Sequence, residues 1–216
     1  MELAEIVPDA VAFLGQLAYL QLDAFESFSL LVTQVSDLEA KRVLARSAGL
    51  ALGKHEALCE ELERLGADPH DAMSEFVGEI EAFRELTIAP TWEEGLLGVH
   101  VSMGILDDFF LRLSAGLPDD VSTSVARVLG GDDGREGTVR VLQKAIEDDP
   151  QVSSRLALWG RRMVGDVLLV ARSALSRSAA ELVGNRPLSD EARIEPVVTD
   201  IIAAHTRRMD ALGLTA

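Results

Sequence analysis

Apolar residues recur every three or four positions along almost the whole chain, and this spacing constrains the fold more than any other feature. Between residues 9 and 35, one apolar stripe contains Val11, Leu14, Ala18, Leu22, Phe25, Phe28 and Leu31. Steps of three and four place side chains on one face of an α-helix, whereas a β-strand needs alternation at every second residue. Because such alternation is rare here, we expect an all-α protein and identify no strand.

Helix starts are marked by Ser36 with Glu39, Thr91 with Glu94, Asp68-Pro69, Asp149-Pro150, and Ser189 or Asp190. These combinations satisfy the free amides of a first turn or tolerate the missing proline amide. The resulting six or seven helices are expected at 9–35, 36–65, 68–86, 91–114, 119–147 with a break at 130–134, 150–182, and 189–213 with a kink near Pro196. Their short loops favour one helical bundle domain over residues 1–216, with its core at about 9–148 and two further helices at 150–214.

Composition excludes several classes of protein. The chain has 36 acidic and 20 basic residues in 216, for a net charge of −16, and this balance argues against a broad nucleic-acid interface. The one cysteine, Cys59, cannot form an internal disulfide, so we expect a reducing cytoplasm. No apolar run approaches the roughly 18–20 residues of a membrane span, and the acidic start MELAEIVPDA is unlike a signal peptide.

Helical bundles commonly hold di-iron centres, and their ligand signature can be searched for directly. Such a centre takes one Glu from each of two helices and Glu-x-x-His from each of two others, because this spacing puts both ligands on one helix face. The chain has four histidines, His55, His70, His100 and His205. No carboxylate lies three or four positions before or after any of them. The usual di-iron signature is therefore absent.

Four segments carry a resemblance to a known family. They are LGQLAYLQLDAF at 14–25, LERLGADPHDAM at 62–73, DDPQVSSRLALWGRRMVGD at 148–166 and DIIAAHTRRMDALGL at 200–214. In order and spacing they resemble the ferritin-like family of tRNA hydroxylases that act on 2-methylthio-isopentenyl-adenosine. The resemblance implies a ferritin-like four-helix bundle with additional C-terminal helices and, in active members, a di-iron oxygenase centre.

The chain departs from that family where the metal would lie. By resemblance, the ligand positions fall on Gln21, Ala51, Lys54, Met103, Gly131 and Gly134, and none of these is a carboxylate or a histidine. We interpret them as vestigial positions, with no metal ligand and no catalytic residue among them. If Lys54 faces inward, its ammonium takes the place of metal charge and pairs with Asp107 or Asp108. We favour the alternative that Lys54 extends to the surface, because lysine is rarely fully buried.

Three other sets of residues offer weaker functional hypotheses. A metal site could be rebuilt from carboxylate oxygens on the predicted bundle helices, which carry Glu26, Glu56, Asp107 and Asp108. Chance clusters of acids are nevertheless expected in so acidic a chain. His55 and Cys59 are too few for a structural zinc site. Arg155, Arg161, Arg162 and Arg172 form a possible binding stripe for RNA phosphate or an acidic partner. We favour instead their pairing with the acidic segment 54–81, within the chain or across a dimer.

The sequence thus favours a cytoplasmic ferritin-like protein with a degenerate metal site and no cofactor. We expect it to act by binding or assembly, as a homo-oligomer or with a protein partner, without a membrane or nucleic acid. One alternative is a di-iron oxygenase, a tRNA-modifying hydroxylase that binds iron through unusual ligands. A second alternative is a small-molecule or lipid binder whose vacated cavity is lined by Met103, leucines and valines.

Overall fold

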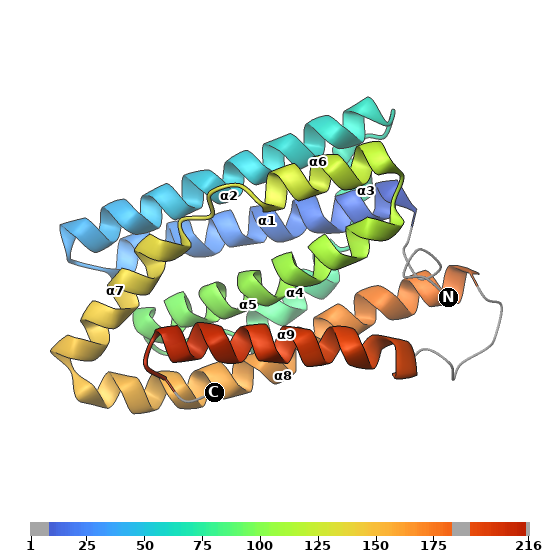
Figure 1. Cartoon of the computed structure of the whole chain (residues 1–216). Helices are drawn as coiled ribbons and strands as arrows, with labels where there is room; N and C mark the ends of the chain where they lie inside the picture. Colours follow the sequence, from blue (N-terminus) through green and yellow to red (C-terminus); the bar gives the residue numbers. More distant parts are fainter. Residues whose placement is uncertain (1–8, 183–190, 215–216) are drawn as a thin grey trace.

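Helices account for nearly all of the regular structure in a computed structural model of the chain, which describes residues 9–182 and 191–214 (Figure 1). Their bounds are α1 Ala10–Gln34, α2 Leu38–Arg64, α3 Pro69–Ser74, α4 Val77–Leu86, α5 Trp92–Leu113, the short 3-10 helix η2 Ser114–Gly116, α6 Asp119–Leu129, α7 Arg135–Asp148, α8 Pro150–Leu182 and α9 Glu191–Ala211. No strand occurs among these described residues. The expected all-α class is therefore confirmed.

A bundle with four helical positions surrounds the candidate site, and α6 and α7 share one of these positions. α1 and α2 pack along their length as a hairpin, α5 lies beside α1, and α6 followed by α7 occupies the fourth position against α2 and α5 (Figure 1). α8 packs on α5, and α9 contacts both α5 and α8. A continuous buried apolar cluster joins these layers, from Phe13 in α1 through Phe109 and Phe110 in α5 to Met209 in α9. Among the described residues, every helix is too short or too polar to span a bilayer.

Most predicted boundaries are close to the observed ones, and the differences have local causes. Thr91 caps α5 as expected, its hydroxyl accepting from the Glu94 amide at 3.4 Å. The cap of α2 is Asp37 and not Ser36, because the Asp37 carboxylate reaches the Ala40 amide at 2.8 Å. The expected single helix at 68–86 is divided into α3 and α4 at residues 75–76.

The C-terminal predictions are resolved only in part. α9 is unbroken at Pro196, which removes one backbone donor near the start of the helix without ending it. The expected closing turn at 184–187 and the caps Ser189 and Asp190 lie outside the described residues. With α3 and α4 separate and α6 and α7 distinct, the described chain contains nine α-helices rather than six or seven.

The break at 130–134 shapes the fourth helical position. α6 ends at Leu129 and α7 begins at Arg135 after Gly134, whose φ of +70° is a conformation that favours glycine. A Cβ at Gly134 would lie 2.5 Å from the Ser47 hydroxyl oxygen, so this turn approaches the α2 backbone closely. Asp132 and Asp133 accept from the Gly134 and Arg135 amides, each at 2.9 Å, and so fix the start of α7.

Candidate functional site

The centre of the bundle contains a small cavity of about 40 Å³ that polar and apolar side chains line together. Its lining comes from α1, α2, α5 and the start of α7, and it includes Gln21, Ala24, Phe28, Ser47, Ala51, Lys54, Val99, His100, Met103, Gly104, Asp107, Asp133, Arg135 and Thr138. A cavity of this volume holds a few water molecules, whereas pockets for drug-sized ligands measure roughly 300–1,000 Å³. The cavity therefore suits ordered water and side-chain hydrogen bonding.

A buried ion pair crosses this cavity. The Lys54 ammonium of α2 lies 3.4 Å from Oδ2 of Asp107 in α5, and each residue is 8% exposed. On the other carboxylate oxygen, Oδ1, Asp107 accepts from the Gln21 side-chain amide at 3.0 Å. Burial raises the pKa of Asp107, and both Lys54 and Gln21 oppose that rise by stabilising the carboxylate.

The expectation that Lys54 extends to solvent is therefore wrong. The position of Lys54 on α2 directs its stem between α1 and α5, where Asp107 compensates a charge that would otherwise be costly to bury. Of the two partners considered from sequence, Asp107 is the one bound. Asp108, the next residue, points to another helix and pairs with Arg208 of α9.

A second ion pair enters the cavity from the helix break. The Arg135 Nη2 lies 2.8 Å from Oδ2 of Asp133, and both residues line the cavity. The sequence interpretation treated the segment 130–134 as a break and assigned no site role to Asp133 or Arg135. The one available signal was the pair of acids inside a glycine-rich break, because acids there can cap the following helix.

The six vestigial positions are not all brought together. Gln21, Ala51, Lys54 and Met103 line the same cavity, as a shared ligand position would require. Gly131 and Gly134 do not line it, and border two separate surface pockets on either side of the break. The i,i+3 phase of a continuous helix is lost at 130–134, so the residues that reach the centre from this segment are Asp133 and Arg135.

The donor set at the centre does not fit a di-iron cluster. It contains two carboxylates, Asp107 and Asp133, and each is already bound to a cation of the chain. The one imidazole, His100, has a pKa lowered to about 4 by burial and by the nearby Arg135 and Arg208. Two iron ions would face Lys54 and Arg135 with fewer ligands than the usual four carboxylates and two histidines.

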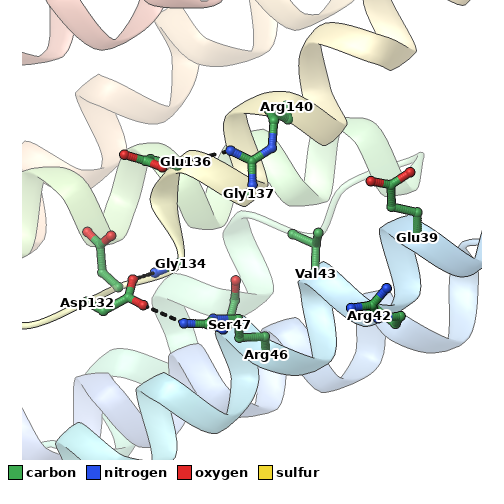
Figure 2. A pocket seen from close by; sticks show the side chains of 11 residues that line it. Glu39, Arg42, Val43, Arg46, Ser47, Asp132, Gly134, Glu136, Gly137 and Arg140 are labelled. Atoms are coloured by element: carbon green, nitrogen blue, oxygen red, sulfur yellow. Dashed lines mark hydrogen bonds and ion pairs between the residues drawn. The ribbon is translucent and has the colours of Figure 1, made fainter.

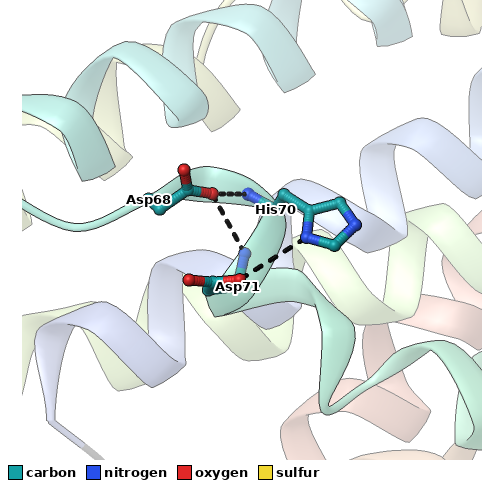
Figure 3. Close-up of side chains that lie close together, drawn as sticks. All are labelled: Asp68, His70 and Asp71. Carbon is teal, nitrogen blue, oxygen red and sulfur yellow. Dashed lines mark hydrogen bonds and ion pairs between the residues drawn. The ribbon is translucent and has the colours of Figure 1, made fainter.

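The other metal hypotheses are not supported by proximity. Glu26 pairs with Arg84 on α4, Glu56 is exposed, and Asp107 and Asp108 bind separate cations, so these acids form no shared site. Within the described residues, a group able to offer three ligand atoms together is Asp68, His70 and Asp71 (Figure 3). All three are exposed, and Asp68 already accepts from the two following amides as the cap of α3.

The His55 and Cys59 pair is also brought together without forming a reactive site. The Cys59 sulfur lies 3.6 Å from Nε2 of His55, whose Nδ1 is 2.9 Å from the Ala18 carbonyl oxygen. Burial and the nearby Glu63 and Glu56 carboxylates raise the pKa of the Cys59 thiol. A raised pKa keeps the thiol protonated, which is opposite to what a nucleophilic cysteine needs.

A charged cleft lies between α2 and the start of α7, with a volume of about 460 Å³ (Figure 2). Three arginines line it, Arg42, Arg46 and Arg140, alongside Glu39, Asp132, Asp133 and Glu136. Arg46 binds Asp132 at 2.8 Å and Arg140 lies 3.8 Å from Glu136 (Figure 2). Because acids match the arginines, this cleft has no excess of positive charge for a phosphate.

The possible arginine stripe lies on α8. Arg155, Arg161 and Arg162 are exposed, whereas the Arg172 side chain lies outside the described residues. Arg162 lies 3.8 Å from Asp166 on its own helix and 5.2 Å from the centre of the Trp159 ring. The hypothesis that the stripe pairs with the acidic segment 54–81 stays a prediction.

Comparison with known proteins places this architecture in a family. A family model described as a ferritin-like domain of actinomycetes matches residues 5–186, which is most of the chain. A search of curated proteins gives no match. Together with the α1, α2, α5 and α6–α7 bundle, this match shows that the chain belongs to the actinomycete ferritin-like domain family.

Proposed function

We propose that this ferritin-like protein acts by binding or assembly, with side-chain ion pairs in place of a di-iron centre. The observation that carries the proposal is the buried contact of Lys54 with Asp107, supported by Gln21. Ferritin-like oxidases use carboxylates at the bundle centre to balance the charge of iron. Here Lys54 and Arg135 balance Asp107 and Asp133, so the centre is neutral without a metal ion.

We interpret the resemblance to tRNA hydroxylases as common descent of the scaffold, which is compatible with this proposal. An active hydroxylase of that kind needs iron ligands at positions where this chain has Gln21, Ala51, Lys54 and Met103. The charge balance also disfavours tRNA, because the net charge of −16 repels a polyanion. We propose a cytoplasmic location and a homo-oligomeric or protein-bound state on the sequence arguments given above.

The small-molecule or lipid alternative receives little support at the bundle centre. Met103 and Val99 line the cavity as that alternative requires, yet charged and polar groups make up most of the remaining lining and no leucine is among the lining residues. Burying an apolar ligand against Lys54 and Asp107 would replace their hydrogen-bonding surroundings by hydrocarbon, which is unfavourable.

Metal content tests the proposal directly. The protein is purified from cells grown with added iron, and iron, manganese and zinc are measured per chain by elemental analysis. We expect well under one ion per chain and no change on adding ferrous iron under anaerobic conditions. About two irons per chain, lost in the Asp107→Leu variant and retained in the surface variant Asp148→Asn, would overturn the proposal and favour the di-iron oxygenase.

Two further measurements address how the protein acts. Light scattering during size-exclusion chromatography gives the mass in solution, where we expect a multiple of 23.3 kDa or a stable complex with a co-purified protein. A titration with tRNA is done at low ionic strength, where electrostatic attraction to phosphate is strongest. We expect no binding even there, because the chain has a net charge of −16. Salt-sensitive tRNA binding would revive the hydroxylase alternative.

A further inference from the structure

The contact between α5 and α9 contains an unusual concentration of polar side chains. Arg208 of α9 lies over Gly104 of α5, where a Cβ would approach the Arg208 Nε to 2.6 Å. The Arg208 side chain is 10% exposed, and one of its terminal nitrogens, Nη2, donates to Asp108. This glycine therefore admits a guanidinium into the helix interface, and Asp108, its carboxylate partner in the described part of the chain, holds only part of it.

Several buried polar atoms at this contact have no hydrogen-bond partner among the described residues. They are Nε and Nη1 of Arg208, Nδ1 of His205 and Nε2 of His100. His205 is 3% exposed and His100 is 6% exposed, so neither imidazole reaches bulk water. Buried donors and acceptors without partners weaken an interface, and these are concentrated where α9 joins the bundle.

The surroundings of both imidazoles favour their neutral form. His100 faces Arg135 from α7, Arg208 and His205 from α9, and the carboxylate of Asp133 from the segment before α7. Burial is the main cause that lowers the pKa of His100 to about 4, and the two arginines add to it. Burial and then Arg208 also lower the pKa of His205.

We propose that the α9 segment 202–214 is a pH-sensitive strap, docked on α5 and α8 at neutral pH and released when His100 and His205 become protonated. Each imidazolium would be a second cation beside Arg208, and the acids at this contact, Asp108 and Asp133, are already paired with Arg208 and Arg135. Release also separates Met209 from Gly160, where the methionine fills the space that a Cβ on α8 would take. It therefore uncovers apolar surface at Gly160 and the neighbouring buried Leu97.

The direction of the effect follows from proton linkage. Because the docked state binds the proton more weakly than the released state, docking is strongest above about pH 6.5 and weakens as pH falls towards 4. A full return of His100 from a pKa of about 4 when docked to about 6.5 when released would weaken docking by about 20-fold between pH 7 and pH 5, and this is an upper limit for His100 because Arg135 of α7 stays beside it. His205 changes docking in the same direction.

Hydrogen exchange followed by mass spectrometry tests the strap on the full chain. After correction for the intrinsic exchange rate, we expect protection of residues 202–214 to fall from pH 7 to pH 5, by up to about 20-fold through His100 and further through His205, with α1 and α2 keeping theirs. Unchanged protection of this segment would overturn the proposal. The loss of protection in α1 and α2 to the same extent would also overturn it, because that indicates global unfolding.

Variants separate the two imidazoles from other acid-sensitive groups. His205→Leu and His100→Leu remove the titrating imidazoles. Since Nδ1 of His205 and Nε2 of His100 have no partner among the described residues, these substitutions break no hydrogen bond of those two nitrogens. Each should reduce the pH dependence of protection, and the double variant should abolish it. His70→Leu, an exposed histidine on α3, is the matched control and should behave as wild type. Full pH dependence in the double variant would show that other groups release α9, and would overturn the proposal.

This inference does not depend on metal content. It can fail while the proposed function holds, and the proposed function can fail while this inference holds.

Discussion

Replacing Lys54 by methionine tests whether its ammonium compensates Asp107 inside the bundle. Methionine keeps most of the apolar length of lysine, so the substitution removes the charge with little change in packing. The Lys54 and Asp107 side chains are 9% and 11% exposed, so little solvent screens the pair. Removing one partner of such a buried pair leaves an uncompensated charge and costs about 3–5 kcal/mol of unfolding free energy.

The cost should depend on pH in a defined way. Burial already raises the pKa of Asp107, and the loss of Lys54 removes one of the groups that oppose this rise. Below the pKa in the variant, Asp107 is protonated and neutral, so the cost of Lys54→Met should shrink as pH falls. At neutral pH, with a denaturant slope of about 2 kcal/mol/M, the urea midpoint should fall by roughly 1.5–2.5 M.

Urea unfolding followed by circular dichroism measures this difference, and two further variants sharpen it. Lys144→Met breaks a surface pair with Asp37, 3.6 Å apart and more than half exposed on both sides, and should cost about 0–1 kcal/mol. The double variant Lys54→Met/Asp107→Leu removes both charges and should recover most of the loss. If Lys54→Met costs no more than Lys144→Met, the ammonium is not buried against Asp107 and the argument for the centre fails.

Two other predictions concern the walls of the bundle. Burial, opposed in part by Arg84, raises the pKa of Asp23 to about 6, so the folded state prefers the neutral acid and gains stability as pH falls through 6. Asp23→Asn should therefore stabilise the protein by up to about 3 kcal/mol at pH 7.5 and by little near pH 4, as measured by urea unfolding; an equal effect at both values would contradict the assignment. Gly134→Ala should destabilise the protein by about 1–2 kcal/mol through the left-handed backbone and by about 1–3 kcal/mol more through the overlap with Ser47. Gly66→Ala, at φ +80° in open space, should show the backbone effect alone. Equal losses in thermal unfolding would show that the turn at Gly134 does not press on α2.

The helical elements could be predicted because their signals are local. The apolar spacing in α1, the Thr91 cap of α5 and the glycine-rich break after α6 each act within a few residues. The errors are local as well. Ser36 and Asp37 are adjacent candidates for one cap. The backbone geometry that decides between them cannot be read from the sequence. The division between α3 and α4 likewise has no proline or glycine at Glu75 or Phe76, and the nearby Gly78 lies inside α4.

The candidate site was predictable only in part. A search for acid-x-x-His depends on spacing along one helix, so the sequence alone established that the usual di-iron signature is missing. The orientation of Lys54 was predicted wrongly because general rarity of buried lysine was weighed without knowledge of its neighbour. Arg135 and Asp133 were missed as central residues because the loop before α7 loses the regular helical phase.

By itself, the sequence determined that this chain forms helices, where most of them begin and end, and that no standard di-iron ligand set lies along them. Tertiary structure alone decided that Lys54 meets Asp107 across α2 and α5, that Asp133 and Arg135 reach the centre, and that α9 covers His100. The physical reason is range. Hydrogen bonding and apolar periodicity act within a helix, whereas the partner of a buried charge depends on how residues more than fifty positions apart are rotated towards one another.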